Sequence, residues 1–193
     1  MTLSKNKIRK EVLARRDAIH QDSHLTHSID LLMSVSSLPE WKNAKSVLLY
    51  LGIKTEFDPQ PLVEAAISME KTVALPRMLR KENRLEIRKV QSLDRDLISG
   101  VWGLREPDPS SCPEMDPSSL DLILVPGVAF DLQGHRMGYG AGLYDRLLSN
   151  EKLTAVRVAA LFNEQCIPEV PCEPHDLPVD ILVLPNQIIR IHS

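Results

Sequence analysis

The stretch that decides the fold runs Val125-Pro-Gly-Val-Ala-Phe-Asp-Leu-Gln-Gly-His-Arg-Met-Gly-Tyr-Gly-Ala-Gly-Leu-Tyr-Asp-Arg-Leu-Leu148. An apolar run, residues 122–125, leads into it and stops at Pro126-Gly127, as a buried strand does where it leaves a sheet. The sequence becomes helix-like again at Leu143. The stretch therefore predicts a strand, a long glycine-rich loop and a helix, which is a unit of an α/β fold.

The glycine segment, residues 134–146, has the composition of an anion site. Its glycines are Gly134, Gly138, Gly140 and Gly142. Alternating glycines allow successive backbone N–H groups to point into one concave nest, and the helix that follows adds the positive end of its dipole. Arg136 and Arg146 flank the nest, and Asp145 adds a carboxylate. The segment suits a phosphate with a metal ion, although many glycine-rich strand-to-helix loops bind nothing.

The glycine segment matches neither standard nucleotide-binding loop. After Gly138 and Gly140, the dinucleotide pattern needs a third glycine at position 143, where Leu143 stands. The phosphate loop of P-loop enzymes needs Gly-Lys-Ser or Gly-Lys-Thr, and neither tripeptide occurs in the chain. A nucleotide would have to be held in another way.

Length and composition indicate one ordinary globular domain covering residues 1–193. Hydrophobic residues make up 43% and charged residues 25% of the chain. The net charge of −3 argues against a nucleic-acid binder, which usually carries a basic face. There is no long apolar span, and the polar start resembles no signal peptide, so we expect a cytoplasmic protein without membrane contact. The three cysteines lack metal-ligand or Cys-x-x-Cys spacing and are interpreted as reduced structural thiols.

Two helices are predicted before the first strand. Residues 3–20 form the first, with one apolar face made of Ile8, Val12 and Ile19. Lys5 and Arg9, at i and i+4, share a face of this helix and could place two cations on a polyphosphate, or simply be solvated. Residues 23–37 form the second helix, with Ile29, Leu32, Met33 and Ser36 expected to point inward. Trp41, after this helix, is expected to pack in the core.

Short apolar runs predict the strands of one sheet. Buried strands are expected at 46–51, 71–76, 120–125, 155–162 and 181–184, and an antiparallel or edge strand at 84–90. Residues 187–191 are expected either to close the sheet or to form an edge strand. Asp58-Pro59 opens a helix that runs to about Glu70. The loop before it contains Glu56, at the end of a strand where ligands of open α/β sheets bind. A single loop glutamate is, however, usually just solvated.

Two further segments carry side chains that bind ligands in other proteins. Trp102, beside Gly103, could stack on a flat heterocycle or cover the edge of the core. His175 and Asp176 lie in a proline-rich loop and suggest either catalysis or plain turn residues.

Together these pieces resemble the 5-formyltetrahydrofolate cyclo-ligase family. The most specific part is Pro126-Gly-x-x-Phe-Asp-x-x-Gly-x-Arg-x-Gly-Tyr-Gly-x-Gly-x-Tyr-Asp-Arg146. The resemblance also includes Lys5-x-x-x-Arg9, Tyr50-Leu-Gly-x-x-x-Glu56, Leu75-Pro-Arg77, Trp102-Gly-Leu-Arg-Glu-Pro107 and Val170-Pro-x-x-x-His-Asp176. It spans nearly the whole chain, in order. It implies a single-domain, three-layer α/β fold with a mainly parallel central sheet, related to sugar-phosphate isomerases and CoA transferases (NagB/RpiA/CoA transferase-like).

The resemblance also implies a reaction. The family converts 5-formyltetrahydrofolate and ATP, with Mg²⁺, into 5,10-methenyltetrahydrofolate, ADP and phosphate. The formyl oxygen attacks the γ-phosphate, N10 attacks the resulting imidate carbon, and phosphate leaves as the ring closes. Such chemistry depends on charge neutralisation and in-line placement more than on a protein nucleophile. We expect a monomer that binds these two substrates.

Site residues follow from the resemblance by position. ATP is expected to contact Lys5, Arg9, Arg136, Gly138, Tyr139, Gly140, Ala141, Gly142, Leu143 and Tyr144, with Arg9 and Arg136 the catalytic cations. Folate is expected to contact Leu51, Glu56, Trp102, Tyr139, Gly140, Ala141, Gly142 and Leu143. Asp145 and Asp176 are expected to hold Mg²⁺, directly or through water.

Two departures from the family pattern keep an alternative open. Ala141 stands where relatives commonly have Gly or Lys, and Leu143 where an aromatic residue is usual. A folate- or nucleotide-binding relative with reduced or lost turnover is therefore the second hypothesis. A sugar-phosphate isomerase on the same architecture is a third, and the Lys5/Arg9 pair disfavours it because an isomerase holds no triphosphate.

Overall fold

The computed structural model describes residues 4–100, 104–173 and 177–191. A seven-stranded sheet has the order β11-β10-β9-β6-β1-β2-β3. Its strands are β1 (Ser46–Leu48), β2 (Thr72–Leu79), β3 (Arg84–Val90), β6 (Leu122–Leu124), β9 (Val156–Ala160), β10 (Ile181–Leu184) and β11 (Gln187–Arg190). The five central strands are parallel, whereas β3 and β11 pair antiparallel at the two edges. The predicted mainly parallel sheet and both edge strands are confirmed.

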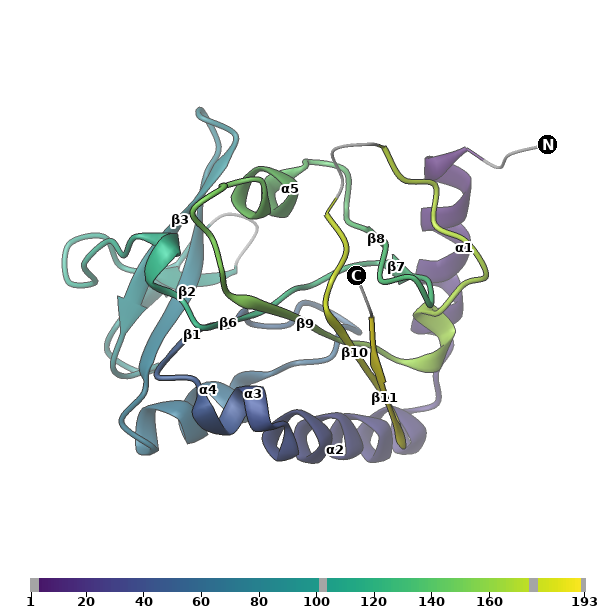
Figure 1. Ribbon diagram of the computed structural model, residues 1–193, viewed down its shortest axis with the longest axis horizontal. Helices are drawn as coiled ribbons and strands as arrows, with labels where there is room; N and C mark the ends of the chain where they lie inside the picture. The colour runs from purple at the N-terminus through teal and green to yellow at the C-terminus, as the bar shows by residue number, and fades with distance from the viewer. Residues whose placement is uncertain (1–3, 101–103, 174–176, 192–193) are drawn as a thin grey trace.

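Helices cover both faces of the sheet, which gives three layers (Figure 1). On one face lie α2 (Gln21–Ser37), α3 (Pro39–Asn43) and α4 (Gln60–Ser68), and on the other α5 (Leu143–Leu148). Successive strand residues point to opposite faces. Val47 of β1 therefore belongs to the core cluster under α2–α4, whereas Leu48 belongs to the cluster that includes Leu147 and Leu148 of α5. The predicted packing role of Trp41 is confirmed, since it is 2% exposed.

The first helix stands apart from these layers. α1 (Lys5–Asp17) buries Ile8 and Val12 against a short hairpin made of β7 (Ala129–Phe130) and β8 (Arg136–Met137). The side chain of Ser4 caps its first turn. The helix ends at Asp17 instead of residue 20, because the next helix already begins at Gln21 with His20 as its N-cap. The position of α1 matters because it brings the basic face of the helix to the glycine segment.

The predicted inward face of the second helix is only partly right: Leu32 packs against the core and Ser36 is half-buried, but the other two residues are exposed. Ile29 is 47% and Met33 67% exposed, and the fully buried residues of α2 are Leu31 and Val35. The packed face begins with His24, whose ring lies 4.6 Å from that of Phe162 between ring centroids. A polar residue thus takes a core-facing position, and this blurred the apolar periodicity in the sequence.

Other differences concern short elements. The hairpins β7–β8 and β4 (Leu97–Ser99) with β5 (Arg105–Pro107) were not predicted, because two- and three-residue strands leave little periodic signal. The helix expected at Asp58-Pro59 begins at Gln60, and Asp58 Oδ1 instead accepts from the backbone N–H groups of Gln60 and Gly52, at 3.1 and 3.0 Å. The cysteines of the described chain form no disulfide. None of the described helices is long and apolar enough to cross a membrane.

The strand order creates a crevice between β1 and β6. The chain leaves β1 toward β2 on one side, and leaves β6 toward β9 and β10 on the other. Loops that follow parallel strands therefore diverge at this point, which is where ligands of open α/β sheets bind. The two loops are residues 49–59, which contain Glu56, and residues 125–142, which contain most of the glycine segment.

Candidate functional site

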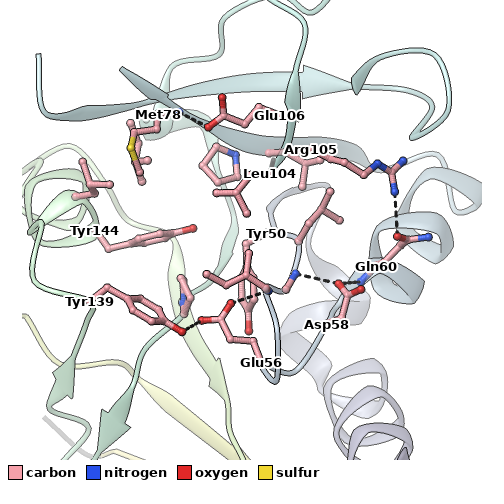
Figure 2. A pocket seen from close by; sticks show the side chains of 18 of the residues that line it. Tyr50, Glu56, Asp58, Gln60, Met78, Leu104, Arg105, Glu106, Tyr139 and Tyr144 are labelled. Carbon is pink, nitrogen blue, oxygen red and sulfur yellow. Dashed lines mark hydrogen bonds between the residues drawn. The ribbon is translucent and has the colours of Figure 1, made fainter. Parts of the chain in front are cut away.

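A cavity of about 780 Å³ occupies the crevice (Figure 2). Its walls come from the loop after β1, the β2–β3 pair, residues 104–106 and the glycine segment with the start of α5. This volume lies in the range of roughly 300–1,000 Å³ that is typical of small-molecule sites. The cavity therefore has room for one substrate molecule among walls that are mostly apolar.

Glu56 supplies a buried carboxylate to this cavity. Its side chain is 9% exposed, and the Tyr139 hydroxyl donates to its Oε1 (Figure 2). The backbone N–H of Ile53 donates to Oε2 at 3.0 Å. Burial raises the pKa of Glu56, and the hydrogen bonds from Tyr139 and Ile53 and the charge of Arg16 oppose that rise. A carboxylate has about four acceptor positions, so Glu56 retains acceptor capacity for a ligand.

Two tyrosines of the glycine segment act as hydrogen-bond donors. Burial raises the pKa of both Tyr139 and Tyr144, so both hydroxyls keep their protons at neutral pH. The Tyr139 proton is used by Glu56, whereas the buried Tyr144 hydroxyl has no partner among the described residues. Tyr144 lines the cavity, and its unused hydroxyl can therefore donate to a ligand there.

The backbone of the glycine segment turns as the sequence predicts. Gly140 and Gly142 have φ of 106° and 63°, in the left-handed region that favours glycine. Arg9 of α1 reaches across to the segment, where its Nε donates to the Gly138 carbonyl oxygen at 2.9 Å. Arg146 Nη2 donates to the Ala141 carbonyl oxygen at 2.5 Å. Two cations thus contact the glycine loop: Arg9 from α1 and Arg146 from α5.

Arg136 is the most deeply buried cation of the segment. It projects from β8, its side chain is 3% exposed, and its Nη2 donates to Asp145 Oδ1 at 2.5 Å. Its Nε is buried without a partner in the described part of the chain. A buried guanidinium with an unused donor is suited to binding an anion.

The metal prediction rests on fewer groups. Asp145 is 32% exposed and is paired with Arg136, and the described residues contain no group of three or more His, Cys, Asp or Glu side chains that could hold a metal ion. Asp176, the other predicted ligand, and Trp102, the predicted folate platform, lie outside the described residues. A single carboxylate still fits Mg²⁺ that is held chiefly by phosphate oxygens and water, which is its usual way of binding with nucleotides.

The fold brings most of the predicted site residues together. Leu51, Glu56, Tyr139, Leu143 and Tyr144 line the cavity. Arg9 contacts the glycine segment at Gly138, and Arg136 lies within the segment; neither arginine is among the described residues that line the cavity, nor are Gly138, Gly140, Ala141 and Gly142. Lys5 lies one turn before Arg9 and pairs at the surface with Glu173, Nζ to Oε1 at 2.9 Å. Ion pairs of this exposed kind are weak and can exchange for a ligand.

Several cavity residues escaped the sequence interpretation. They include Tyr50, Lys54, Asp58, Arg105 and Glu106. Arg16, which contacts both Tyr139 and Glu56, was also missed. Arg16 follows Ile8 and Val12 at i+8 and i+4, so a charge on the apolar stripe of the first helix was the available signal. Tyr50, Arg105 and Glu106 fall inside motifs of the family resemblance but were given no role there, and Lys54 and Asp58 lie on the loop after β1, which carries no comparable pattern.

The left-handed backbone at Gly140 leads to a prediction about stability. We expect Gly140→Ala to lower the free energy of unfolding by about 1–3 kcal/mol, because an alanine at φ 106° is strained. Gly138→Ala is the matched control, since Gly138 lies outside the left-handed region and a Cβ there would meet nothing closer than Arg136 Nη1 at 4.0 Å. Thermal unfolding of both variants tests this. Equal midpoints would show that the loop does not require its left-handed turn at Gly140.

Comparisons with known proteins agree with the geometry. A model of the 5-formyltetrahydrofolate cyclo-ligase family matches residues 1–185. The probable 5-formyltetrahydrofolate cyclo-ligase of Schizosaccharomyces pombe is 32% identical over 203 residues, which cover 98% of this chain and 99% of the relative. The NMR structure of Aquifex aeolicus 5,10-methenyltetrahydrofolate synthetase is 34% identical with a TM-score of 0.85, over 99% of this chain and 94% of that chain.

A second solved structure supports the fold alone. It is that of a 5,10-methenyltetrahydrofolate synthetase from Mycoplasma pneumoniae, which is 19% identical. Its TM-score is 0.75, over 98% of this chain and 100% of that chain.

Proposed function

The chain belongs to the 5-formyltetrahydrofolate cyclo-ligase family, and from that premise we propose that it converts 5-formyltetrahydrofolate and ATP into 5,10-methenyltetrahydrofolate, ADP and phosphate. One structural observation supports the proposal independently of family membership. The same cavity is bounded by a buried carboxylate, Glu56, and by Tyr139, Leu143 and Tyr144 of the glycine segment, which also contains the buried Arg136 and is contacted by Arg9 at Gly138. A carboxylate can accept hydrogen bonds from a pteridine, and the cations can bind the oxygens of a triphosphate.

Folate recognition is assigned to the carboxylate side of the cavity. The pteridine ring of folate presents an amino group and ring N–H groups, which are donors and therefore need acceptors. Glu56 has acceptor capacity left after its bonds to Tyr139 and Ile53. Leu51 and Leu143, which line the cavity, add apolar surface for the ring. Because the ionised form of Glu56 is the acceptor, folate binding weakens as pH falls through its raised pKa.

The triphosphate is assigned to the glycine segment. Backbone N–H groups between Gly138 and Gly142 and the guanidinium groups of Arg9 and Arg136 bind phosphate oxygens. Lys5 joins them by exchanging its surface pair with Glu173. The left-handed residues Gly140 and Gly142 allow the backbone to come close to an anion without side chains in between.

The chemical step then needs placement and charge neutralisation. The formyl oxygen attacks the γ-phosphorus and ADP leaves, which gives a phosphorylated imidate. N10 attacks the imidate carbon, and phosphate departs with the former formyl oxygen as the ring closes. Arg136 lies buried beside the glycine segment and stabilises the charge on the transferring group. The unpartnered Tyr144 hydroxyl donates to an oxygen of the substrate.

Mg²⁺ belongs to the proposal through the nucleotide. When bound, it supplies neutralisation of the charge on the β- and γ-phosphates. Asp145 is the protein group assigned to it, and Asp176, the other expected ligand, lies outside the described residues. Asp145 also pairs with Arg136, so the same carboxylate orients the catalytic cation.

A turnover assay tests the proposal. Purified protein is mixed with 5-formyltetrahydrofolate, ATP and Mg²⁺, and methenyl absorbance is followed together with phosphate release. We expect one phosphate for each methenyl product, and no product without ATP. A second candidate, a folate-binding relative without turnover, is favoured by Leu143, an aliphatic residue in the cavity wall at a position where relatives usually have an aromatic one. Normal binding of both substrates with no product would support that alternative.

A further inference from the structure

Arg16 is a buried cation that neither the family motifs nor the sequence interpretation assign to the site. It lies in the last turn of α1, and its side chain is 3% exposed. A buried guanidinium is strongly unfavourable unless partners satisfy it. The groups that Arg16 contacts therefore indicate its role.

Those partners come from both loops that form the cavity. Arg16 Nε donates to Thr55 Oγ1 at 3.1 Å, and Nη1 donates to the Tyr139 hydroxyl oxygen at 3.2 Å. Nη1 also lies 3.8 Å from Glu56 Oε1. Thr55 and Glu56 belong to the loop after β1, and Tyr139 belongs to the glycine segment. Arg16 thus joins the two walls of the crevice.

The chemistry of arginine fixes the direction of the hydrogen bonds. A guanidinium group has donors and no acceptor, so the Tyr139 oxygen must accept from Arg16. The single proton of the Tyr139 hydroxyl is then left for Glu56 Oε1. Burial raises the pKa of Tyr139, which keeps this proton in place. The relay Arg16–Tyr139–Glu56 therefore orients the carboxylate without touching a ligand.

The loop that contains Glu56 is fastened at the neighbouring residue as well. The Thr55 hydroxyl donates to Asp17 Oδ1, and His24 Nε2 lies 3.1 Å from the Thr55 carbonyl oxygen. Both contacts come from helices, α1 and α2, whose positions are set by packing. The carboxylate is held from a rigid support, as a preorganised recognition group needs to be.

We propose that Arg16 is a positioning residue for folate recognition, which fixes the Tyr139 hydroxyl as a donor to Glu56 and so holds the Glu56 carboxylate in the orientation that accepts from the pteridine. This inference rests on the proposed role of Glu56. It assigns to α1 a part in folate binding, in addition to the phosphate contacts of its earlier residue Arg9.

The pH dependence follows from the groups that face Glu56. These are Arg16 from α1, Asp58 from the same loop, Tyr139 from the glycine segment, Tyr50 after β1 and Tyr144 of α5. Burial and Asp58 raise the pKa of Glu56, whereas Arg16 lowers it. Loss of the Arg16 charge therefore raises that pKa further, and the ionised form disappears at a higher pH.

The test is Arg16→Gln, measured by steady-state kinetics across pH. We expect the KM for 5-formyltetrahydrofolate to rise roughly tenfold, as for the loss of a hydrogen bond to a charged group, with the KM for ATP unchanged. The acid limb of kcat/KM for folate should move to higher pH, because the Arg16 charge no longer favours the ionised form of the Glu56 carboxyl. Arg16→Lys keeps the positive charge and should therefore restore most of the wild-type position of the acid limb. Arg15→Gln, an exposed arginine in the same turn, is the matched control and should change neither quantity.

A purely structural role would give a different result. It would lower the yield or the thermal stability of Arg16→Gln and leave the acid limb and the ratio of the two KM values unchanged, and that outcome overturns the inference. If Arg16→Gln does not fold, Tyr139→Phe removes the middle of the same relay and should shift the limb in the same direction; an unshifted limb there counts equally against it.

Carboxyl titration separates this inference from the proposed function. NMR of ¹³C-labelled glutamate in the ligand-free protein follows Glu56 directly. Arg16→Gln, or Tyr139→Phe in its place, should raise its midpoint relative to wild type, whether or not the enzyme turns over. Absence of turnover with a shifted midpoint contradicts the function alone. Normal turnover with an unshifted midpoint contradicts the Arg16 relay alone.

Discussion

Replacing Arg136 with glutamine should lower kcat by about a thousandfold or more, the scale seen when a positioned arginine is removed from phosphoryl transfer. Arg136 is buried beside the glycine segment and has one donor without a partner, so its charge acts where water is excluded. Glutamine keeps part of the volume and removes the charge. Steady-state rates at saturating ATP and folate measure the loss, because saturation removes effects on binding.

Two matched variants show whether the loss is specific. Arg136→Lys keeps a charge but not the forked donors, and should recover only part of the rate. Arg157→Gln removes another partly buried arginine, which pairs with Asp180 through Nε and Nη2 at 3.0 and 2.6 Å. Arg157 lies near the amino end of β9, away from the crevice, so its loss should leave kcat within about threefold, as distant surface changes usually do. An Arg136→Gln enzyme with near-normal kcat would remove Arg136 from the chemical step.

Glu56→Gln should lower kcat/KM for 5-formyltetrahydrofolate by about a hundredfold, because a site built around an acceptor then presents an amide donor to the pteridine donors. The KM for ATP should stay unchanged, since we assign the triphosphate to the glycine segment, away from Glu56. The acid limb that Glu56 contributes should disappear as well, because glutamine does not titrate. Initial rates against folate at several pH values measure both effects.

Glu106→Gln is the matched control for Glu56. Glu106 is also buried and also lines the cavity, where its Oε1 accepts from the Met78 backbone N–H at 3.2 Å (Figure 2). An amide can retain that contact, since its own oxygen still accepts. If Glu106→Gln were as damaging as Glu56→Gln, general loss of buried charge would explain both, and Glu56 would have no special role in recognition.

The sheet could be predicted from sequence because its signals are local. The runs at residues 47–51, 122–125 and 158–162 are continuously apolar, as is typical of strands buried on both faces. The alternation in residues 84–90 separated an edge strand from these. The alternating glycines predicted a loop whose backbone N–H groups point into a nest, and the structure adds that Gly140 and Gly142 adopt a left-handed backbone, which few other residues adopt. The inward face of α2 could be predicted only in part, since His24 packs on Phe162 through contacts that no local pattern reveals.

The site residues also differ in whether a local sequence signal identifies them. Residues inside the glycine segment could be assigned as a group, because the chain itself holds them together. Glu56 could be assigned only through the resemblance, since nothing in its own loop distinguishes it from a solvated glutamate. Arg16 was missed because its partners Thr55 and Tyr139 are 39 and 123 residues away in sequence. Only the folded structure shows that this one arginine donates hydrogen bonds to both loops.

The most direct test of the account follows the formyl oxygen itself. The enzyme is given 5-formyltetrahydrofolate labelled with ¹⁸O in the formyl group, together with unlabelled ATP, and the released phosphate is analysed by mass spectrometry. If the formyl oxygen attacks the γ-phosphorus and leaves with it, each phosphate released with methenyl product carries one ¹⁸O. Unlabelled phosphate alongside methenyl product would mean that ATP is hydrolysed without phosphorylating folate, and it would contradict the proposed reaction.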